Sequence, residues 1–181
     1  DTPEKVAGLL LTAYPDRTPT LINEWMSDNT DYMGPRNSMG DREGDQMFFW
    51  LEDTESGNDS PEHIWMIYYE GIYKTNEALN AIQELGGATN ASLRNSEGEA
   101  LLLRAYNHFV LVNEFSRAYN SKTSQTDPGI YYATEVADFS ETTAQANRGT
   151  VAEDYAKISA DIEAGIPLIN DSYKVPKYHF N

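Results

Sequence analysis

The feature that most constrains the fold is the stretch from Ser96 to Ser116, which carries apolar residues on two faces of a predicted helix. Ser96 and Glu99 have the spacing of a capping box, in which two side chains satisfy free backbone amides at a helix start. This pattern predicts a helix that ends at about Tyr119. Its two faces hold Leu102, Tyr106, Phe109 and Asn113, and Leu101, Ala105, Val112 and Phe115. Because both faces need cover, the stretch predicts a stack of helices.

Other segments carry the start signals of helices. A capping residue followed by proline, which commonly opens a helix, occurs at Thr2, Thr18 and Ser60. The segment after Ser60 runs to a glycine pair at Gly86 that would end a helix. Its aromatic and aliphatic residues recur at three- and four-residue spacing: Trp65, Tyr68, Tyr69, Ile72, Tyr73, Asn76, Leu79 and Ile82. This segment and the Ser96 stretch are predicted to form an antiparallel helical hairpin.

A second capping box, formed by Thr150 and Glu153, precedes one more helical pattern. Its apolar stripe consists of Val151, Tyr155, Ile158, Ile162 and Ile166. The fold class is therefore predicted to be all-α, with helical hairpins and long irregular loops. At 181 residues, a single domain over 1–181 is expected.

Composition excludes several kinds of function. The formal charge of −16 argues against nucleic acid and against anionic membrane surfaces, because both are bound through clustered Lys and Arg. The chain has no cysteine, and His63, His108 and His179 lack metal-ligand spacing, so no metal site or cofactor is predicted. Neither a nucleophile elbow nor a phosphate-binding loop is present. No apolar run reaches membrane-spanning length, and the first residues are polar.

Some polar residues fall within the helical patterns. Asn76 lies on a packed face and is expected to be a buried, hydrogen-bonded asparagine. Arg104 is expected to pair with a carboxylate that fixes helix packing, and the candidates are Glu70, Glu77 and Glu114. Asp154 and Asp161 fall outside the apolar stripe of the last helix, so both are expected on a solvated face.

The long polar segment from Ser27 to Ser60 is the candidate for a binding surface, because loops of this length are usually functional or mobile. One apolar run, Met47–Leu51, interrupts it as either a helical turn or a short extended piece. Tyr32 and Trp50 are predicted to stack on sugar rings, since an aromatic face suits the C–H face of a pyranose. The alternative is that Trp50 only plugs the loop. A second polar loop, 121–126, is a candidate to flank a ligand surface.

Several motifs resemble the SusD/RagB family of glycan-binding outer-membrane lipoproteins. The resemblance is carried by Glu99-Ala100, Arg104-Ala105-Tyr106, Phe109, Leu111-Val112, Phe115 and Arg148-Gly149-Thr150-Val151-Ala152-Glu153. It implies tetratricopeptide-like helical hairpins and the N-terminal part of a longer SusD-like fold. The chain departs from the family after Phe115, where Ser116-Arg117 stands in place of a glycine-containing turn.

The resemblance also implies a function. It implies non-catalytic capture of an oligosaccharide at the cell surface and delivery to a TonB-dependent outer-membrane transporter. Membrane contact would come only through a lipid anchor, which this sequence does not contain; the anchor was either trimmed away or the protein is not exported.

Two other functions remain open from the residues. A tetratricopeptide-like scaffold could grip a peptide or protein partner along a groove between helices. A helical glycoside hydrolase would need two carboxylates facing each other across a cleft. An acidic run, Asp53-Thr-Glu-Ser-Gly-Asn-Asp59, alternates oxygen ligands but lacks the spacing of an EF-hand, and a solvated loop is the expected reading.

Overall fold

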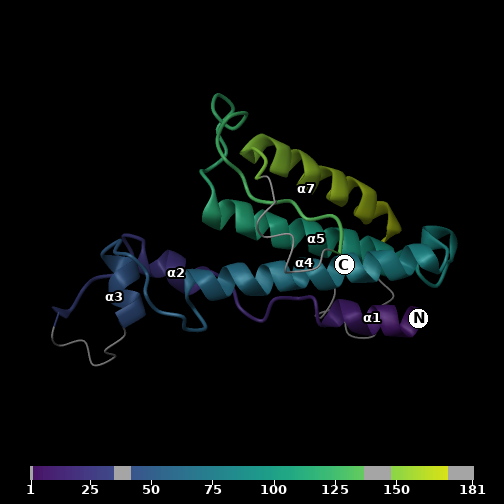
Figure 1. Ribbon diagram of the computed structural model, residues 1–181, viewed down its shortest axis with the longest axis horizontal. Helices are drawn as coiled ribbons and strands as arrows, with labels where there is room; N and C mark the ends of the chain where they lie inside the picture. Colours follow the sequence, from purple (N-terminus) through teal and green to yellow (C-terminus); the bar gives the residue numbers. More distant parts are fainter. Residues whose placement is uncertain (1, 35–41, 137–147, 171–181) are drawn as a thin grey trace. The chain divides into compact units, whose positions relative to one another are not determined.

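The computed structural model describes residues 2–34, 42–136 and 148–170, and their regular secondary structure is helical (Figure 1). The helices are α1 (Pro3–Leu11), α2 (Thr20–Trp25), α3 (Arg42–Phe48), α4 (Pro61–Glu84), α5 (Arg94–Phe115) and α7 (Val151–Gly165), with short 3-10 helices η2 (Gly87–Thr89) and η3 (Ile166–Leu168). The extended segments of the described residues pair only at an isolated bridge between Pro128 and Thr150. The predicted all-α class is confirmed. No helix in these ranges is both long and apolar enough to cross a membrane.

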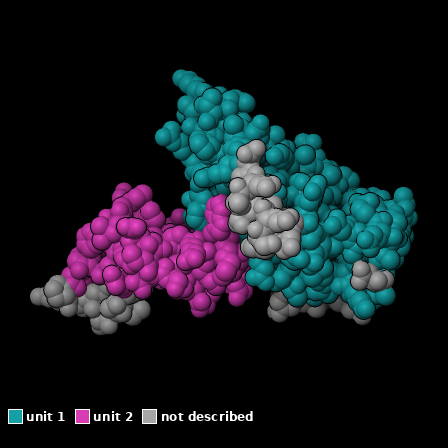
Figure 2. Space-filling model, viewed as in Figure 1, with its two compact units in different colours: residues 1–14, 68–181 teal, residues 15–67 magenta. Residues whose placement is uncertain are grey.

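The chain groups into two compact units, which Figure 2 shows in different colours. The long-helix unit consists of residues 1–14 and 68–181, and the loop unit consists of residues 15–67. Each unit has its own buried apolar side chains. In the loop unit these are Ile22, Met47 and Ile64, and in the long-helix unit they include a cluster of Val6, Leu10, Ala78, Ile82, Leu93 and Ala100.

Most of the predicted helix starts are confirmed. The Thr2 hydroxyl caps α1, and the Ser60 hydroxyl accepts a hydrogen bond of 3.1 Å from the backbone amide three residues on. At α7 both halves of the capping box form, with Glu153 accepting from the Thr150 amide at 2.8 Å and the Thr150 hydroxyl accepting from the Glu153 amide at 3.3 Å. These side chains satisfy backbone donors that have no partner inside a helix.

The predicted cap at Thr18 is wrong. Helix α2 begins at Thr20, and its N-cap residue is Pro19, which makes no side-chain cap. The Thr18 hydroxyl instead lies 2.8 Å from the hydroxyl of Thr20. A hydroxyl that pairs with a neighbouring side chain is not available to the backbone amides, so this short helix starts uncapped.

The capping box predicted at Ser96 is also wrong. Helix α5 starts earlier, at Arg94, and ends earlier than expected, at Phe115. Ser96 and Glu99 are both buried within its first turns. The N-cap residue is Leu93, which is completely buried and makes no side-chain cap. The start of this helix is therefore set by apolar burial and not by side-chain capping.

The antiparallel hairpin of α4 and α5 is confirmed for the part of α4 in the long-helix unit. Tyr68 lies across from Tyr106, with ring centroids 6.4 Å apart, while Gln83, later in α4, donates to Glu97, near the start of α5, at 3.2 Å. Residue numbers thus rise along one helix as they fall along the other. Between the helices, Gly86 at φ +106° opens the turn that the glycine pair predicted.

Helix α7 packs antiparallel on another side of α5, so α5 is covered from more than one side as predicted (Figure 1). Gly98 and Gly165 lie in close contact between the two helices, and a β-carbon on Gly98 would lie 2.9 Å from the Gly165 carbonyl oxygen. At the other end Phe109 lies edge-on to Tyr155, with centroids 6.2 Å apart. Phe109 thus contacts α7.

The apolar stripe predicted for α7 is only partly buried. Val151 and Ile158 are buried, whereas Ile166 is 60% exposed. The buried stripe of this helix includes two carboxylates, Asp154 and Asp161, which the sequence had placed on a solvated face. That prediction is wrong because partners for both carboxylates come from distant parts of the chain, as described below.

Candidate functional site

An exposed group of aromatic side chains lies at the end of α3 in the loop unit. The ring of Tyr32 lies 5.9 Å from that of Phe48 and 4.8 Å from that of Phe49, measured between centroids. Phe48 and Phe49 meet edge-on at 5.0 Å. We call these three residues the aromatic cluster. Tyr32 is 42% exposed, and Trp50, next in sequence to the cluster, is 73% exposed.

The backbone around Trp50 forms a Schellman motif, the hydrogen-bonded turn that ends many helices. The amide of Leu51 donates to the carbonyl of Gln46 at 2.9 Å, and the amide of Trp50 donates to the carbonyl of Met47 at 3.1 Å. Trp50 occupies the left-handed position of this motif at φ +54°, where glycine is usual. A side chain costs about 1–2 kcal/mol there. Strained residues of this kind concentrate at functional sites.

The rest of α3 is anchored to the loop unit, which gives the aromatic side chains a fixed base. Met47 is buried, and Gln46 exchanges two hydrogen bonds with Thr54, one of them 2.8 Å long. Gly44 lies against the indole of Trp25, close enough that a β-carbon would be 3.1 Å from the ring. The apolar run therefore begins as the last two residues of α3, Met47 and Phe48, and continues as a turn, and its buried anchor is Met47. The alternative reading of Trp50 as the plug is wrong, because its ring faces solvent.

The acidic run after α3 offers no metal site within the described ranges. Asp53 accepts a hydrogen bond from the amide of Glu55 at 3.0 Å, and Glu55 lies 3.4 Å from the guanidinium of Arg42. No group of three potential ligands comes together among residues 2–34, 42–136 and 148–170. Of the three histidines, His179 lies outside these ranges.

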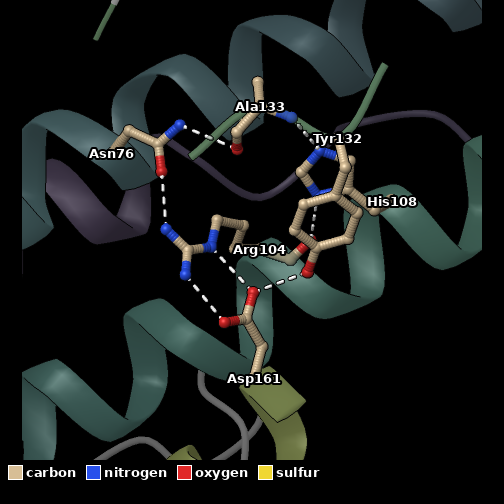
Figure 3. Close-up of polar contacts among 6 residues, drawn as sticks. All are labelled: Asn76, Arg104, His108, Tyr132, Ala133 and Asp161. Carbon is tan, nitrogen blue, oxygen red and sulfur yellow. Dashed lines mark hydrogen bonds and ion pairs between the residues drawn. The ribbon is translucent and has the colours of Figure 1, made fainter. Parts of the chain in front are cut away.

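The long-helix unit contains a buried polar network, drawn in Figure 3. Arg104 of α5 donates two hydrogen bonds to the two carboxylate oxygens of Asp161 of α7, each 2.7 Å long. A third donor of Arg104 reaches the side-chain oxygen of Asn76 at 3.1 Å. The hydroxyl of Tyr132 donates to Asp161 at 2.6 Å. Arg104 therefore pairs with Asp161 and not with Glu70, Glu77 or Glu114.

His108 completes the network. Its Nε2 accepts a hydrogen bond of 3.0 Å from the amide of Ala133, so the ring carries its proton on Nδ1, which donates to the carbonyl of Arg104 at 2.9 Å. The ring stacks on that of Tyr132 at 3.7 Å between centroids. Burial lowers the pKa of His108 to about 3, with the nearby Arg104 charge adding to the shift, so the ring is neutral at pH 7.

The network holds the extended segment after Gly129 against the helices. Asn76, buried as predicted, donates to the carbonyl of Ala133 at 3.1 Å, and Asp154 accepts from the amide of Ile130 at 2.7 Å. Burial raises the pKa of Asp154. Since these groups face one another and not a cleft, we assign the network a structural role. It does not provide two carboxylates across a cleft, as glycoside hydrolysis requires.

A family model described as "Starch-binding associating with outer membrane" matches residues 1–181. The chain belongs to this SusD-like family. The resemblance seen in the α5 and Arg148–Glu153 motifs is thereby confirmed. A search of curated proteins finds no significant match.

A solved SusD superfamily structure supports the same fold. The protein, from Bacteroides thetaiotaomicron VPI-5482, superposes with a TM-score of 0.69 at 17% sequence identity. The match covers 94% of this chain and 38% of that protein, so the chain spans well under half of the relative's length. The family description names starch binding, in agreement with the prediction that this chain is not an enzyme.

Sequence reasoning missed Asp161, Tyr132 and His108 as partners of Arg104. One signal was present: Asp154 and Asp161 are seven residues apart and share a helical face with Val151 and Ile158. A carboxylate in such a stripe is buried only when it has a partner, and the family motif in α5 contains a candidate partner, Arg104.

Proposed function

We propose that this SusD-like chain binds oligosaccharides of the starch class through Trp50 and Tyr32. The observation that carries the proposal is the placement of Trp50. Trp50 is 73% exposed on a left-handed backbone at the end of an anchored helix. A broad exposed ring on a fixed base suits a sugar, because the C–H face of a pyranose is apolar and flat.

Polar residues that neighbour these rings in sequence can meet the hydroxyls of a sugar. Asp31 precedes Tyr32 in sequence, and Glu52 lies two residues after Trp50. Both are exposed. Carboxylates accept hydrogen bonds from hydroxyl groups, so stacking and hydrogen bonding can act on one sugar ring together. No nucleic acid partner is proposed, in keeping with the charge of −16.

We further propose that the protein acts at the cell surface as the N-terminal domain of a longer SusD-like protein. It would be held at the outer membrane by a lipid anchor outside this sequence and would deliver its ligand to a TonB-dependent transporter. What supports this part is the family, whose description names association with the outer membrane.

Isothermal calorimetry with malto-oligosaccharides of increasing length tests the binding proposal. We expect Trp50→Ala to weaken binding at least tenfold, or about 1.4 kcal/mol, and Tyr32→Ala to weaken it less, because the cluster holds part of that ring's surface. Trp65→Ala is the matched control, since it removes a tryptophan of α4 outside the aromatic cluster. Unchanged affinity in both Trp50→Ala and Tyr32→Ala would remove these residues from the site.

A second candidate function is binding of a peptide or protein partner. Ile162 of α7 and Ile166, the C-cap residue of that helix, are 37% and 60% exposed and lie four positions apart, on one side of the helix end. Exposed aliphatic side chains in a row are typical of protein contact surfaces. Ile166→Asp would abolish such a contact and leave oligosaccharide binding unchanged, which separates the two functions.

A further inference from the structure

An open hollow of about 590 Å³ lies where α5 ends, within the long-helix unit. Its polar lining comes from Glu114, Ser116, Arg117, Asp127 and Arg148. In Figure 1 the chain after α5 rises beside the start of α7 before it turns back along the helices. A volume of this size is within the range of small-molecule sites.

Arg148 presents unused hydrogen-bond donors to this hollow. Its Nε donates to the carbonyl of Gly129 at 2.7 Å, and its Nη2 lies 3.5 Å from the carbonyl of Phe115. These contacts hold the guanidinium in place. Within the described part of the chain, no hydrogen bond occupies Nη1. The fixed guanidinium can therefore donate to the oxygen atoms of a ligand without first giving up its own supports.

Ser116 adds a second unused group. Its hydroxyl oxygen is buried and has no hydrogen-bond partner among the described residues. Leaving a buried hydroxyl unpaired is unfavourable, so a ligand group that hydrogen-bonds to it would remove that penalty. Ser116 is the C-cap residue of α5, and its backbone is extended there. The hydroxyl is thus carried on a defined turn that lines the hollow.

The charges around the hollow balance. Arg117 lies 3.4 Å from Asp127, which also accepts a hydrogen bond of 2.6 Å from Thr123. Together with Arg148 and Glu114 the lining holds two positive and two negative side chains. An anionic ligand would meet two carboxylates here and a chain of net charge −16. A neutral ligand with many hydroxyls can use donors and acceptors alike.

An aromatic ring stands close to this lining in sequence. Tyr119 follows Arg117 by two residues, and its side chain is 53% exposed. It meets Tyr155 edge-on with centroids 5.2 Å apart, which fixes its orientation. Tyr119 therefore offers an exposed aromatic ring two residues along the chain from the lining, and a ring of this kind can stack on the C–H face of a pyranose.

We propose that this hollow is a second saccharide subsite, which takes one ring of a neutral oligosaccharide. Arg148 donates to ring hydroxyls, Ser116 exchanges a hydrogen bond with one of them, and Tyr119 stacks on the C–H face. The inference rests on the proposed carbohydrate-binding function but uses none of the residues of the loop unit. It assigns the protein two subsites for sugar.

Amide and indole NMR shifts during titration locate the two subsites separately. The probes are maltohexaose, cellohexaose and xylohexaose as neutral ligands and hexagalacturonate as the acidic one. We expect a neutral probe to shift the amides of Ser116, Arg117 and Gly129 in a saturable way. Ser116→Ala and Arg148→Lys should each weaken this response at least fivefold and leave the indole signal of Trp50 responsive. Arg94→Lys, at an arginine that donates to the carbonyl of Pro167, is the control.

Each result decides between the two proposals. Shifts at Trp50 with none at the hollow would overturn the second subsite and leave the proposed function standing. Shifts at the hollow with none at Trp50 would support the subsite and overturn the Trp50 site. If no probe shifted the signals at either place, both proposals would be overturned. Tighter binding of hexagalacturonate than of all neutral probes at the hollow would overturn the neutral ligand class.

Discussion

Arg104 and Asp161 form a two-pronged ion pair that joins α5 to α7, with both hydrogen bonds 2.7 Å long and each side chain 11% exposed. The two residues are 57 positions apart in sequence. Arg104 also bonds to Asn76 of α4. One guanidinium therefore links three helices of the long-helix unit, and its charge is neutralised where water has little access.

Removing one member of this pair is expected to be severely destabilising. Asp161→Asn leaves the guanidinium buried without a counter-charge, which typically costs about 3–5 kcal/mol of unfolding free energy. Urea unfolding measures the change. Glu70→Gln, which breaks the exposed pair with Lys74, is the control and should cost less than about 1 kcal/mol. The double variant Arg104→Met with Asp161→Leu should lose less than Asp161→Asn. Equal losses in all three variants would contradict this account.

The two predicted capping boxes show what local sequence patterns can and cannot predict. Thr150 and Glu153 cap α7 because the chain enters that helix from an extended residue, which leaves the first amides free. Ser96 and Glu99 have the same spacing, but a turn runs directly into α5 ahead of them. Glu99 instead accepts a hydrogen bond from the hydroxyl of Tyr14 at 2.7 Å. Spacing identifies residues that could cap, and the preceding backbone decides whether they do.

Local sequence patterns could not predict which carboxylate pairs with Arg104, for a related reason. The sequence predicted that Arg104 pairs with a carboxylate and that Asn76 is buried, because both sit on packed faces. Which carboxylate faces Arg104 depends on how α7 crosses α5, and that crossing depends on the contact of Gly98 with Gly165. For the proposed binding surface, the sequence pattern placed Tyr32 and Trp50 in a polar segment but gave no sign of the left-handed backbone at Trp50.

His108 makes the stability of the long-helix unit depend on pH. Its pKa is about 3 in the folded protein and about 6.5 when unfolded. The unfolded chain binds the proton more readily between these values, so stability falls as pH falls from about 6.5 to 3. The slope from this residue approaches about 1.4 kcal/mol per pH unit. Urea unfolding at several pH values measures it.

The comparison variant for this test is His108→Gln, which removes the titrating ring. The difference in unfolding free energy between the two proteins should shrink as pH falls, because only the parent loses stability through His108. Asp154, with its raised pKa, contributes with the opposite sign but is present in both proteins. His63→Gln should keep the slope of the parent. A pH-independent difference between parent and His108→Gln would show that the ring is not buried and neutral.

The close contact of α5 with α7 predicts a strong effect of a single methyl group. In Gly98→Ala the new β-carbon would meet the Gly165 carbonyl oxygen at 2.9 Å and the β-carbon of Leu168 at 2.8 Å. Helix separation would cost about 1–3 kcal/mol, measured by thermal or urea unfolding. Gly8→Ala is the matched control, since nothing lies within 4 Å of that position in α1. It should stabilise by about 0.5–1 kcal/mol through helix propensity.

Trp50 offers a test that separates binding from stability. Its left-handed backbone favours glycine, and its ring is mostly exposed, so the ring contributes little by burial. Trp50→Gly should therefore unfold at a urea concentration equal to or above that of the parent. It should also be about 1 kcal/mol more stable than Trp50→Ala, which keeps a β-carbon in the strained conformation. Both variants should lose oligosaccharide affinity equally.

These outcomes would mean that the chain keeps a tryptophan where glycine would be more stable, which is the expected mark of a residue retained for binding. If Trp50→Gly were instead less stable than Trp50→Ala, the left-handed backbone would not be a source of strain. The placement of the indole would then have to come from contacts of the ring itself, and the reason for proposing Trp50 as a binding residue would rest on its exposure alone.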